Sequence, residues 1–311
     1  MRRSGKRGRQ AMDEELRFDG RVVVVTGAGG GLGRQYALMF GGRGAKVVVN
    51  DLGGDEKGSG SCSTAADNVV DEIRATGGQA VANYASVEEG ALIIQAAVDN
   101  FGTVDVVINN AGILRDVSFH KMTDEDWTLL QRVHLNGTRA VTQAAWPILR
   151  DKGYGRIVMT TSAAAIYGNF GQANYAAAKL GILGLANALA EEGRSRNIQV
   201  NTIAPIAASR MTATAFPQEF LANLRAEAIS PLVGWLAHEN CSETKGLFEV
   251  GAGYIAKLRW ERALGHAFGA DRAFTLDDVA RHWGRIVDFT DAEHPLGLND
   301  SLEAVERALR A

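Results

Sequence analysis

Residues 22–33 read VVVVTGAGGGLG: four consecutive valines, Thr26, and then a turn with five glycines from Gly27 to Gly33. An unbroken β-branched run of this kind is typical of a strand that is covered on both faces of a sheet. Glycines allow a tight turn after the strand, and the helix expected next would present free N–H groups that attract a diphosphate. A tight strand–helix connection alone would explain the glycines, but their place after the first strand favours a nucleotide-binding turn.

The rest of the chain alternates short β-branched runs with longer segments of helical composition. The helical segments include residues 67–76, 88–100, 124–149 and 175–194. The other expected strands are Lys46–Asn50, Ala80–Tyr84, Val104–Ile108, Ile157–Thr161, Gln199–Ile203 and Leu247–Val250. This alternation predicts an α/β fold, a Rossmann-type doubly wound parallel sheet of about seven strands.

We expect one main domain over residues 16–253, with a segment of different character on either side. Residues 1–15 are basic near the N-terminus and predict a flexible tail. Residues 254–311 carry aromatic side chains such as Trp260 and Trp283 at irregular spacing. They predict a small helical extension that packs on the main domain or on a partner subunit.

Charge and composition exclude several classes of partner. The chain has 33 Lys+Arg and 36 Asp+Glu, which argues against a nucleic-acid or anionic-membrane partner. The uncharged stretch 157–178 is long enough to span a membrane, but its polar residues make a membrane span unfavourable. Cys62 and Cys241 form no disulfide framework, and the six histidines show no cluster. We therefore expect no metal site and a reducing, cytoplasmic compartment.

Asp51 ends the second expected strand, downstream of the glycine-rich turn. A carboxylate in this place would accept hydrogen bonds from ribose hydroxyls and repel a 2′-phosphate, which favours NAD over NADP. A turn-forming aspartate at a strand end is the alternative interpretation. Arg34 could attract a 2′-phosphate, but we expect it on the exposed first turn of the helix.

Tyr175 and Lys179 share one face of an expected helix, because they are separated by four positions. An unperturbed tyrosine titrates near pH ~10, and a neighbouring lysine cation would lower the pKa of the phenol. Ser162 follows the strand upstream and could hold a substrate oxygen against Tyr175. The spacing alone is weak, but together with the glycine-rich turn and Asp51 it predicts proton transfer beside a dinucleotide.

Two further segments follow expected strands. Asn109, Asn110, Ala111 and Gly112 lie at the carboxyl edge of the sheet, where open α/β sheets bind ligands. Residues 52–63, LGGDEKGSGSCS, form a long polar loop that we expect to be mobile or to act as a lid.

Taken in order, these motifs resemble those of the short-chain dehydrogenase/reductase family. The resemblance implies a homodimer, with Ser162, Tyr175 and Lys179 as catalytic residues. It implies that Ser86 and Val87 flank the adenine and that the turn at 205–210 meets the nicotinamide. The implied NAD-binding residues are Gly27, Gly31, Leu32, Gly33, Asp51, Ser86, Val87, Asn110, Ala111, Gly112, Tyr175, Lys179 and Pro205.

Within that family, segments such as residues 17–34 and 155–181 are similar to the (3R)-hydroxyacyl-CoA dehydrogenase domains of peroxisomal multifunctional enzymes. This implies oxidation of a (3R)-3-hydroxyacyl-CoA to its 3-oxo form, as in fatty acid β-oxidation. Three alternatives stay open: a dehydrogenase of steroids or other bulky alcohols, a reductase of 3-oxoacyl carriers, and an NAD-binding protein without catalytic activity.

The sequence departs from the family pattern at one position. The family carries Asn in a Val-Asn-Leu-x-Gly motif as a fourth catalytic residue, whereas this chain has Val133, His134 and Leu135 there. Asn136 is expected to point elsewhere. The resemblance leaves His134 either as a member of a proton relay or as a packing residue.

Overall fold

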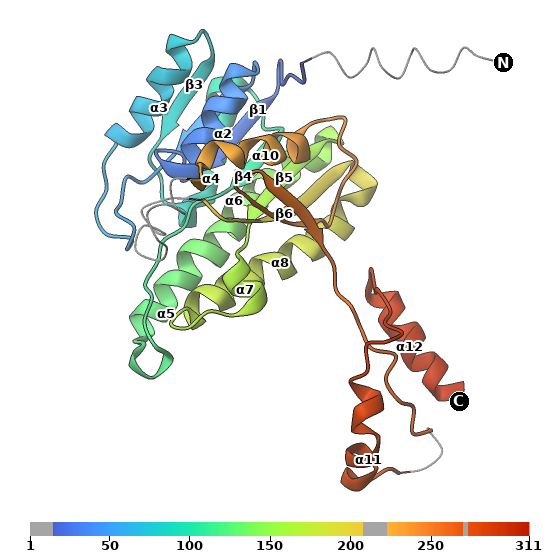
Figure 1. Ribbon diagram of the computed structural model, residues 1–311. Helices are drawn as coiled ribbons and strands as arrows, with labels where there is room; N and C mark the ends of the chain where they lie inside the picture. Colours follow the sequence, from blue (N-terminus) through green and yellow to red (C-terminus); the bar gives the residue numbers. More distant parts are fainter. Residues whose placement is uncertain (1–14, 208–222, 270–272, 311) are drawn as a thin grey trace, which may run out of the picture. The chain divides into compact units, whose positions relative to one another are not determined.

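The computed structural model describes residues 15–207, 223–269 and 273–310. Its central feature is an eight-stranded sheet in the order β3-β2-β1-β4-β5-β6-β7-β8 (Figure 1). The strands from β3 to β7 pair in parallel. The eight strands are β1 (Val22–Thr26), β2 (Lys46–Asn50), β3 (Gln79–Asn83), β4 (Val106–Asn109), β5 (Gly155–Thr160), β6 (Ile198–Pro205), β7 (Leu247–Gly251) and β8 (Tyr254–Leu258). The predicted doubly wound α/β fold is confirmed.

Helices cover both faces of this sheet and create two apolar cores. Successive valines of β1 point to opposite faces, so Val23 and Val25 belong to one core while Val22 and Val24 belong to the other. The first core is completed by helices α2 (Gly31–Gly42), α3 (Thr64–Ala75) and α10 (Ser230–Ala237), and the second by α4 (Gly90–Phe101), α6 (Gly137–Lys152) and α8 (Ala173–Gly193). This two-sided burial explains why the strand valines form an unbroken run.

Shorter helical segments lie between these strands and helices. They are η1 (Val87–Glu89), η2 (Phe119–Lys121), α5 (Asp124–Leu130), the π-helix η3 (Gln131–Asn136), α7 (Ala163–Tyr167), η4 (Arg194–Arg196) and η5 (Ala226–Ala228). Among the described residues, we find no helix with the length and apolar character needed to cross a membrane.

The eighth strand corrects the predicted start of the helical extension. We expected about seven strands and placed Tyr254 at the start of a helical extension, but β8 joins the sheet beside β7. A two-residue turn links them, in which Ala252 and Gly253 have φ angles of 48° and 82°. Two positive φ angles are typical of the tight turns that join antiparallel strands, so this edge of the sheet is a hairpin. The weak turn signal Ala-Gly did not identify the hairpin in the sequence.

The chain divides into two compact units, Met1–Lys257 and Leu258–Ala311. The second unit contains helices α11 (Leu276–Ile286) and α12 (Leu298–Arg310), which agree with the helical composition predicted there. Helix α11 begins with a capping box, in which Thr275 and Asp278 satisfy each other's backbone N–H groups. The predicted flexible tail, residues 1–15, lies outside the described residues except for its last position.

Candidate active site

The predicted site residues follow the carboxyl ends of neighbouring parallel strands. Strands β1, β4 and β5 end at Thr26, Asn109 and Thr160, and the glycine-rich turn, the Asn-Asn-Ala-Gly turn and Ser162 come at or directly after these ends. Strands β2 and β3 end at Asn50 and Asn83, with Asp51 and Ser86 beyond them. The fold therefore brings the predicted residues to the edge where sheets of this kind bind ligands.

The glycine-rich turn is tight because backbone packs on backbone. Gly27 has a φ angle of 63°, in the left-handed region that favours glycine. A Cβ atom at Gly33 would lie 2.1 Å from the carbonyl oxygen of Gly27. Helix α2 can therefore begin directly against the strand end only if Gly33 has no side chain. At Gly30 a Cβ atom would meet nothing within 4 Å, so the turn also has an open side.

Asn110 ties the ends of β1 and β4 together. Its Nδ2 donates to the carbonyl oxygens of Thr26 and Gly27 at 3.0 and 3.2 Å. In return, the hydroxyl oxygen of Thr26 accepts from the backbone nitrogens of Asn110 and Ala111 at 3.0 and 3.1 Å. The Asn-Asn-Ala-Gly turn therefore fixes the glycine-rich turn to the neighbouring strand.

Asp51 lies beside the glycine-rich turn, as predicted, but it also has backbone partners. Its two carboxylate oxygens accept from the nitrogens of Gly29 and Gly53 at 2.8 and 2.7 Å. Arg34, the residue that could attract a 2′-phosphate, is paired with Glu72 on α3, with 3.1 Å between Nε and Oε1. A carboxylate at the strand end and a neutralised arginine both fit NAD better than NADP.

The remaining predicted cofactor residues lie along the same edge. Ser86 caps the short helix η1 by accepting from the nitrogen of Glu88 at 3.3 Å, and Val87 is the first residue of that helix. Leu32 packs against the first core, and Pro205 ends β6. The turn predicted at 205–210 lies partly outside the described residues. The contacts of Ser86, Val87 and Pro205 with a cofactor remain predictions.

Ser162 and Tyr175 meet at the centre of the site. Ser162 caps α7 by accepting from the nitrogen of Ala164 at 3.2 Å, and its hydroxyl is hydrogen-bonded to the Tyr175 phenol. Burial raises the pKa of Tyr175, and the carboxylate of Asp116 adds to this, while the Ser162 hydrogen bond lowers it. The net effect keeps the phenol protonated at neutral pH.

Lys179 is buried one helical turn after Tyr175, and it differs from our expectation. Its Nζ donates to the carbonyl oxygen of Thr160 at 2.8 Å and lies 5.7 Å from the centre of the Tyr175 ring. Burial lowers the pKa of Lys179 to about 7. We expected the ammonium to lower the pKa of the phenol, yet the pKa of Tyr175 is raised. The main reason is the burial of the phenol itself, and the amine donates to the Thr160 carbonyl oxygen instead.

His134 lies in the π-helix η3, a type of irregularity that is frequent at functional sites. Its Nε2 is 3.1 Å from the nitrogen and 2.8 Å from the oxygen of Ile113. Nδ1 is buried without a hydrogen-bond partner among the described residues. Burial, with the positive charge of Lys179, holds the pKa of His134 well below its usual range, so the ring is neutral. A Cβ atom at Gly112 would lie 2.6 Å from this ring, which explains the glycine.

Asn174 is a site residue that the sequence analysis missed. It is fully buried, and its Oδ1 accepts from the nitrogen of Tyr175 at 2.8 Å. Its Nδ2 donates to the carbonyl oxygens of Arg115 and Asp126 at 3.2 and 3.3 Å. The polar residue directly before Tyr175 was the available signal, but only the fold shows which loop it holds.

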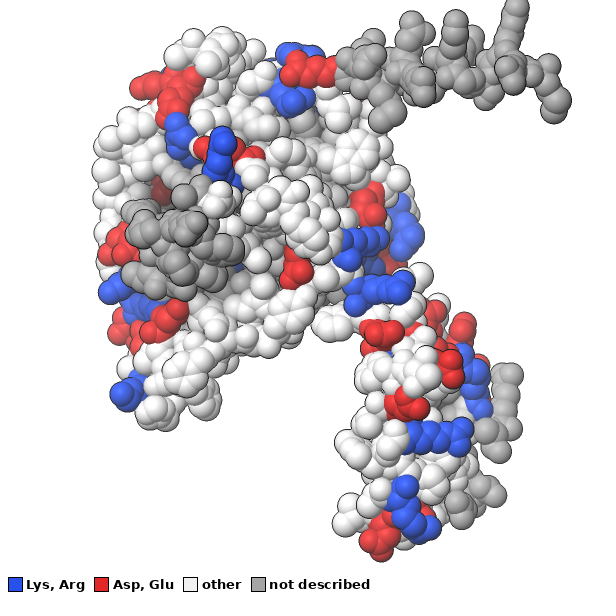
Figure 2. All heavy atoms as spheres, viewed as in Figure 1, with Lys and Arg blue, Asp and Glu red and all other residues white. Residues whose placement is uncertain are grey.

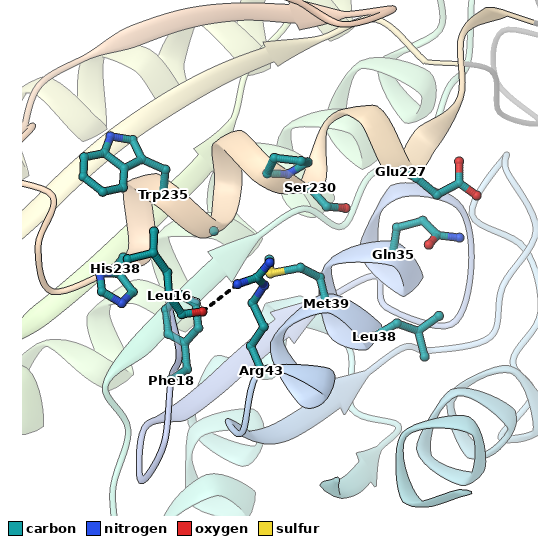
Figure 3. A pocket seen from close by; sticks show the side chains of 12 residues that line it. Leu16, Phe18, Gln35, Leu38, Met39, Arg43, Glu227, Ser230, Trp235 and His238 are labelled. Atoms are coloured by element: carbon teal, nitrogen blue, oxygen red, sulfur yellow. Dashed lines mark hydrogen bonds between the residues drawn. The ribbon is translucent and has the colours of Figure 1, made fainter. Parts of the chain in front are cut away.

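A cavity of the main domain lies apart from the predicted site. A cavity of about 520 Å³ lies between α2 and α10, and Figure 3 shows side chains that line it. Its lining includes Phe18, which precedes β1, and His238, which follows α10. None of the predicted site residues is among the described residues that line it. On the face in Figure 2, Lys and Arg are interspersed with Asp and Glu.

The chain belongs to the short-chain dehydrogenase family, because residues 21–219 match that family. Its cofactor is NAD(H), which the glycine-rich turn and Asp51 fit. It is 58% identical over 299 residues to peroxisomal multifunctional enzyme type 2 of Mus musculus, covering 96% of this chain and 41% of that protein. It is 54% identical over 300 residues to a peroxisomal hydratase-dehydrogenase-epimerase of Neurospora crassa, covering 96% and 34%.

A solved structure agrees with these sequence relationships. The full-length peroxisomal multifunctional enzyme type 2 of Drosophila melanogaster superposes with a TM-score of 0.82 and 42% identity, over 95% of this chain and 50% of that one. This chain spans less than half of the length of each of the two sequence relatives above.

Proposed function

We propose that this chain oxidises (3R)-3-hydroxyacyl-CoA to 3-oxoacyl-CoA with NAD. The observation that carries the proposal is the hydrogen-bonded pair of Ser162 and Tyr175, at the sheet edge that also holds Asp51 and the glycine-rich turn. The hydroxyacyl-CoA assignment is supported by the relatives named as multifunctional and hydratase-dehydrogenase-epimerase enzymes.

When bound, NAD would supply the hydride acceptor that oxidation of the substrate's carbinol carbon requires. Asp51 would hold the adenosine ribose, and the open side of the glycine-rich turn would receive the diphosphate. The Ser162 hydroxyl would position the substrate oxygen, and Tyr175 would exchange the hydroxyl proton with it. In the reverse direction the protonated phenol is ready to donate. In the oxidising direction the phenol would first release its own proton to the Lys179 amine, whose pKa is about 7, and the resulting phenolate would then take the hydroxyl proton of the substrate.

Replacing Tyr175 by Phe tests the chemistry. Tyr175→Phe should lower turnover by a factor of roughly 10²–10⁴, which is what general acid–base catalysis contributes. NADH affinity, measured by fluorescence titration, should change little because the ring remains. Tyr167→Phe is the matched control, since Tyr167 is an exposed tyrosine. Unchanged turnover in Tyr175→Phe would show that Tyr175 is not the proton-transfer residue.

A substrate panel tests the acyl-CoA assignment. NADH formation should be fastest with a (3R)-3-hydroxyacyl-CoA from a chain-length series. The panel includes 17β-hydroxysteroids, other bulky alcohols and 3-oxoacyl carriers in the reductive direction. Faster turnover of a steroid or a carrier substrate would replace the proposed substrate. No turnover of any of them, with intact NADH binding, would favour a non-catalytic NAD-binding protein.

We also propose a homodimer in a reducing, cytoplasmic compartment. Both cysteines are free, and Cys62 is exposed, which suits a reducing environment. The named relatives are peroxisomal proteins. Fluorescence microscopy of a tagged chain, expressed in the organism from which it comes, should therefore identify the compartment. Light scattering on the purified protein should give twice the chain mass of 33.2 kDa.

A further inference from the structure

The loop that follows Asp51 is closed by its own hydrogen bonds. The nitrogen of Cys62 donates to the carbonyl oxygen of Leu52 at 3.1 Å, so the loop ends lie side by side. At its tip, the carboxylate of Asp55 accepts from the nitrogens of Lys57 and Ser59 at 3.0 and 2.8 Å. This is the arrangement of an Ω-loop, which is compact, in the segment that we expected to be mobile or to act as a lid.

The tip of this loop is attached to the segment after the Asn-Asn-Ala-Gly turn. The nitrogen of Leu114 donates to the carbonyl oxygen of Glu56 at 2.8 Å. The adjacent side chain of Arg115 donates from Nε to the carbonyl oxygen of Lys57 at 3.1 Å. A Cβ atom on Gly58 would lie 2.9 Å from Cδ1 of Ile113, so these two residues are in close contact. The contact is therefore both polar and packed.

Arg115 connects this loop to the helix that carries Tyr175. Its Nη1 lies 3.2 Å from Oδ1 of Asp126 on α5, and both side chains are about three-quarters buried. The carbonyl oxygens of Arg115 and Asp126 together hold the Nδ2 of Asn174. Asn174 in turn binds the nitrogen of Tyr175. An unbroken series of contacts thus runs from the loop after Asp51 to the start of α8.

We propose that Arg115 is a positioning residue that fixes the Asp51 loop and the Tyr175 helix relative to each other. The inference rests on the proposed function only in taking Asp51 as the cofactor carboxylate and Tyr175 as the proton-transfer residue. A planar guanidinium with several donors can bind a carbonyl and a carboxylate at once, whereas an ammonium is a single point of charge. Arginine is therefore the side chain that this junction requires.

Loss of the guanidinium should affect both ends of the series. Without it the Lys57 carbonyl loses its donor, and Asp126 becomes a partly buried carboxylate without a cation. Arg115→Ala should therefore raise the NADH dissociation constant about tenfold and lower kcat by a similar factor, the scale of couplings between residues in contact. It should also accelerate amide hydrogen exchange at residues 172–178. Arg115→Lys should recover part of each loss. Arg194→Ala, in an exposed arginine, is the control.

A thermodynamic cycle separates this proposal from a purely structural role. Deleting residues 55–60 should leave a short closed loop, because a Cβ atom at Gly54 would lie 3.2 Å from the carbonyl oxygen of Gly60. In that background Arg115→Ala should no longer weaken NADH binding but should still accelerate exchange at residues 172–178. If the same tenfold effect on NADH persists there, or if Arg115→Ala only lowers stability, the proposal is overturned. If Arg115→Ala does not fold, Arg115→Lys enters the same cycle.

The readouts keep the two hypotheses apart. NADH binding and hydrogen exchange need no substrate, so they test the role of Arg115 even if no hydroxyacyl-CoA is turned over. If no substrate of the panel is turned over but the thermodynamic cycle gives the expected result, the outcome counts against the proposed function alone.

Discussion

The imidazole of His134 stands edge-on to the phenol ring of Tyr175, with 5.3 Å between ring centroids and 85° between planes. The same imidazole is bound to the backbone of Ile113. One neutral side chain therefore positions the phenol and holds the loop that follows β4. This arrangement supports a positioning role, and no described residue is hydrogen-bonded to its Nδ1.

Replacing His134 should affect stability and turnover together. His134→Asn should lower the free energy of unfolding by about 2 kcal/mol, because the shorter side chain leaves Ile113 without a partner. It should also lower kcat about tenfold through the lost ring contact, on the scale expected for residues in contact. Urea denaturation and steady-state kinetics measure the two effects. His120→Asn, in an exposed histidine, is the control, and a wild-type kcat in His134→Asn would contradict the ring's role.

The burial of Lys179 should appear in the pH dependence of stability. Its pKa of about 7 in the folded chain lies below the ordinary value of 10.5, so between these values the unfolded chain binds more protons. Relative to Lys179→Met, the free energy of unfolding should therefore rise with pH by up to ~1.4 kcal/mol per unit. The burial penalty is complete below pH 7 and disappears above 10.5. Urea denaturation of both proteins at pH 6–9 measures this, and a constant gap would contradict the shifted pKa.

Cofactor preference should depend on two carboxylates. Asp51→Asn keeps an oxygen that can accept from Gly29 but removes the charge, so the preference for NAD over NADP should fall about tenfold. Adding Glu72→Gln should release Arg34 and lower the preference further. The ratio of kcat/KM for the two cofactors is the measurement. Glu192→Gln is a surface control, and a double variant no different from Asp51→Asn would show that Arg34 does not reach the phosphate.

Two glycines of the same turn should respond differently to alanine. Gly33→Ala should destabilise the fold by about 3 kcal/mol, because its Cβ would overlap the backbone of Gly27. Gly30→Ala should change stability by less than ~0.5 kcal/mol, since its position is open and its φ of −163° is extended. Thermal unfolding of the two variants compares them. Equal destabilisation would mean that the turn fails for a reason other than this contact.

The sequence predicted the features that depend on local patterns. Valine runs identified the buried strands, and the spacing of Tyr175 and Lys179 placed both on α8. What it could not predict depends on which distant segments meet. The bond from Lys179 to Thr160 and the attachment of Arg115 to Lys57 join residues that no periodicity connects. The raised pKa of Tyr175 also depends on tertiary packing, since burial outweighs the Ser162 hydrogen bond.

The hairpin of β7 and β8 has a practical consequence for anyone who shortens this chain. Strand β8 occupies the edge of the sheet, next to a β7 whose Val250 is buried. A truncation at residue 253, the boundary suggested by composition, would remove β8 and leave β7 with unpaired backbone groups. Such an open edge recruits strands from other molecules, and the product would aggregate. A cut after Leu258 would keep β7 paired, with the charge of Lys257 discouraging further pairing along β8.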